Sequence, residues 1–160
     1  MKTIQQWFDE YTESHQNHTN KTIHFICVPL IYFSIVGLIV SIPTGFLHLY
    51  FQYEPPFYYN FGTIALILVL IFYLRLSFPI FIGMLVFSTI VMTGNYLLST
   101  IDDVPLWLIS IVIFAAAWAG QFFGHKVEGK RPAFFKDIQF LLIGPAWILS
   151  FIYKKINLKY

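Results

Sequence analysis

The sequence has few of the residues that stabilise a small secreted domain or bind nucleic acid. It contains one cysteine, Cys27, which excludes an intrachain disulfide and a cysteine-based zinc finger. Only 11% of its 160 residues are charged, and it has no basic tract, internal repeat or low-complexity stretch, so nothing supports nucleic acid as a partner. The first 23 residues include Asp9, Glu10 and Glu13 and no cleavage site of small residues, so we expect no signal peptide.

Apolar residues are abundant instead, and they indicate an integral membrane protein. Hydrophobic residues account for 58% of the chain and aromatic residues for 20%, and the apolar residues come in blocks. A hydrocarbon core about 30 Å thick needs about 20 residues of helix. We therefore expect an all-α fold, a polytopic membrane helix bundle in a single integral membrane domain (residues 1–160), with four transmembrane helices at 24–42, 57–76, 78–98 and 105–123.

The basic residues predict the orientation of these helices, since short cytoplasmic loops are rich in Lys and Arg. The loops 43–56 and 99–104 contain neither residue type and are expected outside. Basic side chains precede the first span, separate the second from the third and follow the fourth, at Lys2, Lys21, Arg75, Lys126, Lys130, Arg131 and Lys136. These three places are expected on the cytoplasmic side.

A shorter apolar run at 138–153 carries Gly144-Pro145 at its centre. A fifth full span would place the lysines at 154, 155 and 159 on the outer side, against the charge rule. We therefore favour a re-entrant hairpin of two half-helices over a fifth helix, because proline interrupts a helix and irregular backbone is tolerated in a membrane where protein covers it.

The N-terminal segment is expected to form an amphipathic interfacial helix. Its apolar face follows helical spacing and ends in a histidine, at Ile4, Trp7, Phe8, Tyr11 and His15.

Three of the five histidines stand between residues 15 and 24. On one continuous helix His15 and His24 would lie on opposite faces, because nine residues at about 100° each leave them half a turn apart. A break at Asn17, Thr19 and Asn20, with Thr19 or Asn20 as N-cap of the membrane helix, would bring the two imidazoles together. This arrangement suits a metal site, whereas a lone interfacial histidine is more often an anchoring or hydrogen-bonding group.

A second group of polar residues lies at the inner end of the fourth span. Trp118, Gln121, His125 and Glu128 are spaced by three, four and three residues and so share one helical face. Gly120 and Gly124 form a small-xxx-small pair that allows close approach of a neighbouring helix. The alternative reading is structural, with Glu128 paired to a nearby cation, Gln121 bridging helices, and Lys130 and Arg131 holding orientation or touching anionic lipid.

The two groups together resemble a known family. "YTESHQNHTNKTIHFICVP", residues 11–29, is similar to a Y-x-x-x-H-x-N-x-x-N-x-x-x-H-x-x-x-x-P block, and "WAGQFFGHKVEGKRPA", residues 118–133, to a W-x-x-Q-F-x-G-H block followed by Glu and basic residues. The two blocks resemble those of the family of the fungal metabolism-of-phytosphingosine protein. Its characterised member is an iron(II)-dependent dioxygenase of the endoplasmic reticulum membrane that removes one carbon from 2-hydroxy fatty acids in fatty acid α-oxidation.

The resemblance implies a site and a cofactor, Fe²⁺. His15, His24 and His125 match family histidines required for activity and are the expected metal ligands, and His18 is a candidate fourth ligand. Gln121 and Glu128 fall in the same blocks and are the expected catalytic residues. Glu128 follows His125 by three residues where the family pattern has about four.

The chemistry fits these residue types, since imidazole ligands suit iron(II) and leave positions open for O₂ and a chelating 2-hydroxy acid. Lys130 or Arg131 is expected to pair with the substrate carboxylate, and the long acyl tail to lie among membrane helices. The membrane is the cytoplasmic one if the host is bacterial and that of the endoplasmic reticulum if it is eukaryotic.

Two other functions are alternatives to the dioxygenase. A di-iron membrane desaturase or hydroxylase is disfavoured, because neither an H-x-x-x-H nor an H-x-x-H-H box is present. A non-enzymatic lipid-binding or scaffold protein remains the alternative, and metal content separates it from the enzyme.

Overall fold

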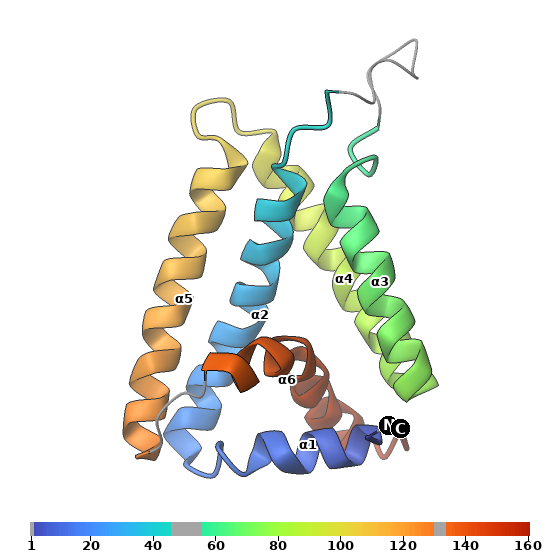
Figure 1. Cartoon of the computed structure of the whole chain (residues 1–160), viewed down its shortest axis with the longest axis vertical. Coiled ribbons are helices and arrows are strands. Elements are labelled where there is room, and N and C mark those ends of the chain that lie inside the picture. Colours follow the sequence, from blue (N-terminus) through green and yellow to red (C-terminus); the bar gives the residue numbers. More distant parts are fainter. Residues whose placement is uncertain (1, 46–55, 130–133) are drawn as a thin grey trace.

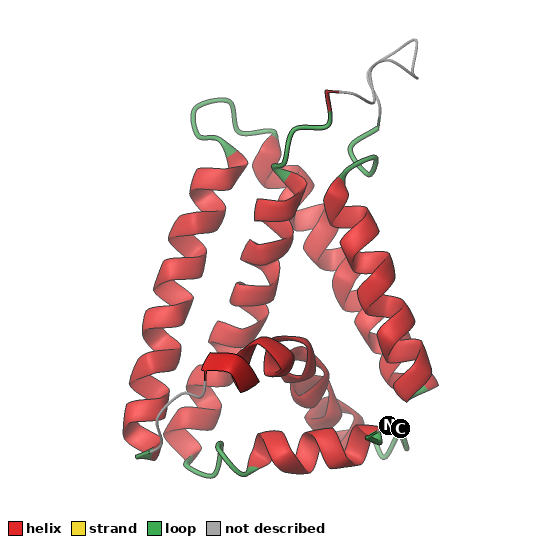
Figure 2. Ribbon diagram, viewed as in Figure 1, coloured by secondary structure: helices red, strands yellow, loops and turns green. Residues whose placement is uncertain are grey.

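The computed structural model describes residues 2–45, 56–129 and 134–160, the segment 134–139 by its backbone alone. These residues form six helices and loops and contain no strand (Figure 2). The helices are α1 (Ile4–Thr12), α2 (His18–Val40), α3 (Phe61–Leu76), α4 (Phe78–Ser99), α5 (Leu106–Glu128) and α6 (Phe134–Lys155). The predicted all-α fold is therefore confirmed for this part of the chain.

Three of these helices, α2, α4 and α5, are long and apolar enough to cross a membrane. The remaining predicted span, the second one at 57–76, is shorter than expected: α3 has 16 residues, which rise about 24 Å. It begins at Phe61 and not at residue 57 because the Asn60 side chain caps it, accepting a hydrogen bond from the Thr63 N–H at 3.0 Å. In Figure 1, α3 nevertheless runs beside α4 along the bundle.

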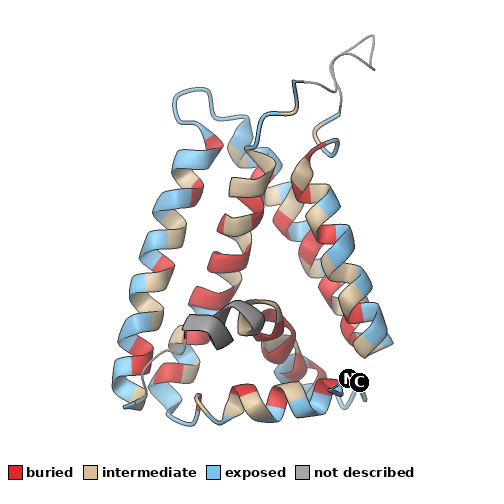
Figure 3. Cartoon of the chain, in the orientation of Figure 1, coloured by how far each residue is buried: buried red, intermediate tan, exposed pale blue. Residues whose placement is uncertain are grey.

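Many positions on α3, α4 and α5 are exposed (Figure 3), and large apolar residues occupy a number of them. Leu68 on α3, Ile90 on α4 and Val112 on α5 are 63%, 63% and 60% exposed. Apolar surface of this extent is rare on soluble proteins and is stable against lipid hydrocarbon. The helix lengths and these exposed faces together indicate a membrane protein.

Helix α2 is central and packs against α3, α4, α5 and α6. Its contact with α5 is the most extensive in the described chain, and glycine makes it possible. A Cβ at Gly124 would lie 2.5 Å from Asn20 Oδ1, and one at Gly120 would lie 2.7 Å from Cys27 Sγ. The small-xxx-small pair therefore brings the two helices that carry His24 and His125 into close contact.

The C-terminal helix differs from the favoured hairpin. Residues 134–155 form one helix, and Gly144-Pro145 lies inside it without separating two half-helices. Proline removes one backbone hydrogen bond and bends a helix that packing holds on both sides. Ile143, Ala146 and Trp147 on either side of Pro145 are all buried, so packing outweighs the break. Figure 1 shows α6 curving across the end of the bundle near the two chain termini.

The predicted N-terminal helix is present as α1, which runs across the same end of the bundle (Figure 1). It ends at Thr12, so His15, the last residue of the predicted apolar face, lies beyond the helix. Thr3 and Gln6 form a capping box that begins it. Its apolar residues Ile4, Phe8 and Tyr11 are buried, and its partner is α6. Trp147 Nε1 of α6 donates a hydrogen bond to Thr12 Oγ1 at 2.9 Å.

Replacing Thr12 by valine should loosen α1 from α6. The change keeps the shape of the side chain but leaves the buried Trp147 N–H without an acceptor, which costs about 1–3 kcal/mol. Hydrogen exchange of the α1 amides in detergent micelles should be faster than in the wild type. Thr12→Ser keeps the hydroxyl and should exchange as the wild type does; equal exchange in all three proteins would show that this bond does not hold α1.

Candidate metal centre

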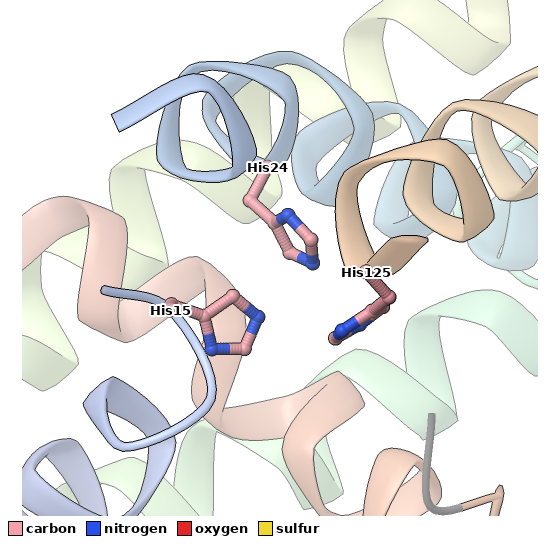
Figure 4. Close-up of side chains that lie close together, drawn as sticks. All are labelled: His15, His24 and His125. Carbon is pink, nitrogen blue, oxygen red and sulfur yellow. The ribbon is translucent and has the colours of Figure 1, made fainter. Parts of the chain in front are cut away.

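Three histidines that are distant in sequence converge at the end of the bundle where α1 and α6 lie. His15 is in the turn between α1 and α2, His24 is in the second turn of α2, and His125 is in the last turn of α5. They are 3%, 0% and 7% exposed, and one nitrogen of each lies within 4.8 Å of the others. Figure 4 shows the rings facing a common space.

The hydrogen bonds of two rings determine which nitrogen carries the proton. His15 Nδ1 lies 2.6 Å from the carbonyl oxygen of Tyr11, and His24 Nδ1 lies 2.9 Å from that of Asn20. Each Nδ1–H must donate to its carbonyl, so each Nε2 carries a lone pair. Both Nε2 atoms are buried and have no hydrogen-bond partner. Metal-binding histidines commonly show this pattern, with one nitrogen anchored to a carbonyl and the other directed at the ion.

Electrostatics also favour a neutral ligand at position 15. Burial, and after it the nearby imidazole of His24, lower the pKa of His15 from 6.5 to about 3. The ring is therefore neutral at pH 7 and offers its lone pair without first losing a proton.

A helix break brings His15 to His24, as the sequence predicted, but it spans residues 13–17. Of the three residues expected to supply the break only Asn17 lies in it, while Thr19 and Asn20 are in α2. Asn17 caps α2, because its side chain accepts hydrogen bonds from the Thr19 N–H at 2.8 Å and the Asn20 N–H at 3.4 Å. The N-cap assignment to Thr19 or Asn20 was wrong. Asn17 has an extended backbone, which turns the chain away from α1 and lets α2 begin at His18.

A small cavity adjoins His24 and His125, and residues of α1, α2, α5 and α6 line it. Tyr11, His24, Trp118, Gln121 and His125 are among the residues that line it, and its volume is about 30 Å³. A water molecule needs roughly 10–15 Å³ of such space, so the cavity has room for about two water molecules or a ligand of that size.

The other predicted residues are distributed as follows. Gln121 lies at the cavity, whereas His18 is exposed at the first position of α2 and is not among the clustered histidines. Both carboxylate oxygens of Glu128 accept hydrogen bonds from the turn before α2. Lys130 and Arg131 lie outside the described residues.

Two aromatic side chains at the site had not been predicted to be there. Tyr11 stacks on His15 with ring centroids 4.1 Å apart, and Trp147 lies 5.7 Å from the same ring. The four-residue spacing of Tyr11 and His15 was a usable signal, because it puts a carbonyl within reach of the imidazole. Nothing local could reveal Trp147, which is far from His15 in sequence and reaches it only through the packing of α6 on α1.

The fold and the cluster define a class: an all-helical protein of membrane type with three buried histidines that could hold a metal ion. The chain belongs to the family described as 2-hydroxy-palmitic acid dioxygenase Mpo1-like, whose model matches residues 1–156. This confirms the family predicted from the two sequence blocks. No curated protein and no solved structure matches the chain.

Proposed function

We propose that this protein is an iron(II)-dependent dioxygenase that converts a long-chain 2-hydroxy fatty acid to the fatty acid one carbon shorter, with loss of CO₂. The observation that supports this most directly is the convergence of two unpartnered, buried Nε2 atoms with the imidazole of His125 in a protein of this dioxygenase family. His15, His24 and His125 are the proposed ligands.

The donor set fits iron(II), because three imidazoles leave coordination positions open. When bound, iron(II) would supply the redox chemistry toward O₂ and accept the hydroxyl and carboxylate oxygens of a 2-hydroxy acid. The protein would orient the metal ligands and keep water away from the site. Carbonyl groups of Tyr11 and Asn20 fix two of the rings, and buried side chains around the cluster exclude bulk water.

Other side chains are proposed to act on the substrate. Gln121 lies at the cavity wall and offers an amide donor to a substrate oxygen. Lys130 and Arg131 follow α5 in the sequence and are proposed to pair with the carboxylate. Because the cavity is small, the acyl tail would extend from it among the apolar helix faces.

The proposed reaction balances without a further co-reactant. One 2-hydroxy acid and one O₂ give one shortened acid, one CO₂ and one water. The bond between C1 and C2 breaks, C1 leaves as CO₂, C2 is oxidised to the new carboxyl carbon, and O₂ is reduced.

The site is proposed to face the cytoplasm. The helix ends on the histidine side of the bundle carry basic residues. These are Lys21 at the start of α2, Arg75 in the last turn of α3, Lys126 in the last turn of α5, and Lys154 and Lys155 in the last turn of α6. Short cytoplasmic segments are enriched in such residues. The loop at the opposite end carries Asp102 and Asp103.

Anaerobic purification followed by addition of iron(II), 2-hydroxypalmitate and O₂ tests the proposal. Mass spectrometry should detect the fatty acid one carbon shorter, in an amount that depends on iron. Palmitate, which lacks the hydroxyl, should not be converted, and zinc should not replace iron. If no 2-hydroxy acid of any chain length is converted and no metal binds, the protein is instead a lipid-binding or scaffold protein.

A further inference from the structure

We propose that Glu128 is a positioning residue that holds His15 in place, and that it neither binds the metal nor transfers a proton. The inference rests on the proposed metal site and assigns a role to this carboxylate. Glu128 Oε1 accepts a hydrogen bond from the Gln16 N–H at 2.8 Å. Its Oε2 accepts from the Asn17 N–H at 2.9 Å and from Asn20 Nδ2 at 3.0 Å.

A carboxylate is unfavourable at the position that Glu128 occupies on its own helix. It is the last residue of α5, where the negative end of the helix dipole disfavours a carboxylate. The N-terminus of another helix compensates, because Glu128 binds the N–H of Asn17, the N-cap of α2. The carboxylate thus acts as a capping group contributed by α5 to the positive end of α2.

These bonds fix the backbone on both sides of His15. Gln16, which follows it, donates to Glu128, and the carbonyl of Ser14, which precedes it, accepts a hydrogen bond from Asn20 Nδ2 at 3.2 Å. The same Asn20 amide group also donates to Glu128. His15 is the one clustered histidine that lies outside a helix, so its position depends on such contacts more than those of His24 and His125 do.

The same contacts argue against direct roles for Glu128. Each oxygen already accepts from the protein, so binding a metal or taking up a proton would disrupt the turn that carries His15. Among the described residues, the group able to hold a metal contains the three histidines and does not include Glu128.

A thermodynamic cycle with cobalt(II) as the probe tests this role. Glu128→Gln removes the charge and turns one acceptor into a donor that faces backbone N–H groups. Cobalt(II) affinity, read from the visible absorption of the bound ion, should fall by about 10- to 100-fold, as it does when supporting groups of metal ligands are lost. In a His15→Ala background, where there is no longer a ligand to position, Glu128→Gln should change the affinity by less than about twofold.

A carboxylate that binds metal directly would weaken cobalt(II) binding in both backgrounds, and that result would overturn the proposal. Unchanged affinity of Glu128→Gln in the wild-type background would also overturn it. Asp103→Asn, which removes a carboxylate from the loop at the other end of the bundle, is the control and should bind as the wild type does. Absence of cobalt(II) binding by the wild type itself would remove the proposed metal site, and this inference with it.

Hydrogen exchange of Glu128→Gln separates positioning from a general loss of structure. Peptides that cover residues 14–17 should exchange faster, while those from the middle of α2 and α5 should keep wild-type protection. Loss of protection along both helices would mean that Glu128 holds the bundle and not the turn, and would overturn the proposal.

Discussion

Replacement of His24 by alanine is expected to abolish iron(II) binding and iron-dependent turnover. His24 is fully buried, its Nδ1 is anchored to the Asn20 carbonyl, and its Nε2 faces the cluster. Loss of a group that only supports a metal ligand lowers metal affinity by about 10- to 100-fold. Loss of the ligand itself should therefore lower the affinity by more than about 100-fold. Metal analysis after anaerobic loading, and mass spectrometry of the lipid products, measure the two effects.

His18→Ala is the matched control. His18 stands on the same helix, but it is exposed and lies outside the cluster. Its replacement should leave both iron content and turnover at wild-type levels. Circular dichroism should show that both variants retain their helices. A His24→Ala protein that still bound iron with wild-type affinity would disprove the proposed ligand set.

Replacement of Gly124 by alanine should disrupt the same centre through packing alone. The new Cβ would lie 2.5 Å from Asn20 Oδ1 and 3.4 Å from His24 Cε1. Asn20 cannot move away freely, because its amide group donates to Ser14 and Glu128. The added methyl group must therefore push α2 from α5, at a cost of about 1–3 kcal/mol. His24 and His125 lie on these two helices, so iron(II) affinity should fall by about 10-fold or more.

Gly45→Ala is the control for this variant, because a Cβ at Gly45 would meet nothing within 4 Å. Thermal unfolding in detergent and iron(II) titration should show wild-type behaviour for Gly45→Ala and losses in both for Gly124→Ala. Wild-type stability of Gly124→Ala would mean that the contact between α2 and α5 is less tight than the structure shows.

The sequence predicted the long helices well, because each is a continuous apolar block with a clear beginning and end. The sequence predicted the ends and the continuity of helices less well where a single cap or local packing determines them. Asn60 caps α3 and shortens the second span, and packing around Trp147 keeps α6 continuous across Pro145. A proline is read locally as a break, but the burial that opposes the break comes from distant residues.

The candidate site was predictable to the extent that it depends on helical spacing. A helix break between Tyr11 and His24 and the shared face of Gln121 and His125 follow from the positions of polar residues along the chain. The contacts of Glu128 could not be predicted from spacing, because its donors, Gln16 and Asn17, lie more than a hundred residues away. Spacing placed Glu128 on the correct face of α5, and only the fold showed which groups it meets.

The packing of α1 on α6 has a consequence for the order in which the centre assembles during synthesis. Helix α1 is synthesised before α6, but its ring contacts include Phe8 with Tyr160 and Tyr11 with Trp147, so its packing is incomplete until those later residues have been made. The ring of His15 stacks on Tyr11 and lies near Trp147, so it gains its full packing only after α6 has formed. Closing so long a loop is slow relative to helix formation, so we expect the three-histidine cluster to reach its final packing only after α1 has packed on α6.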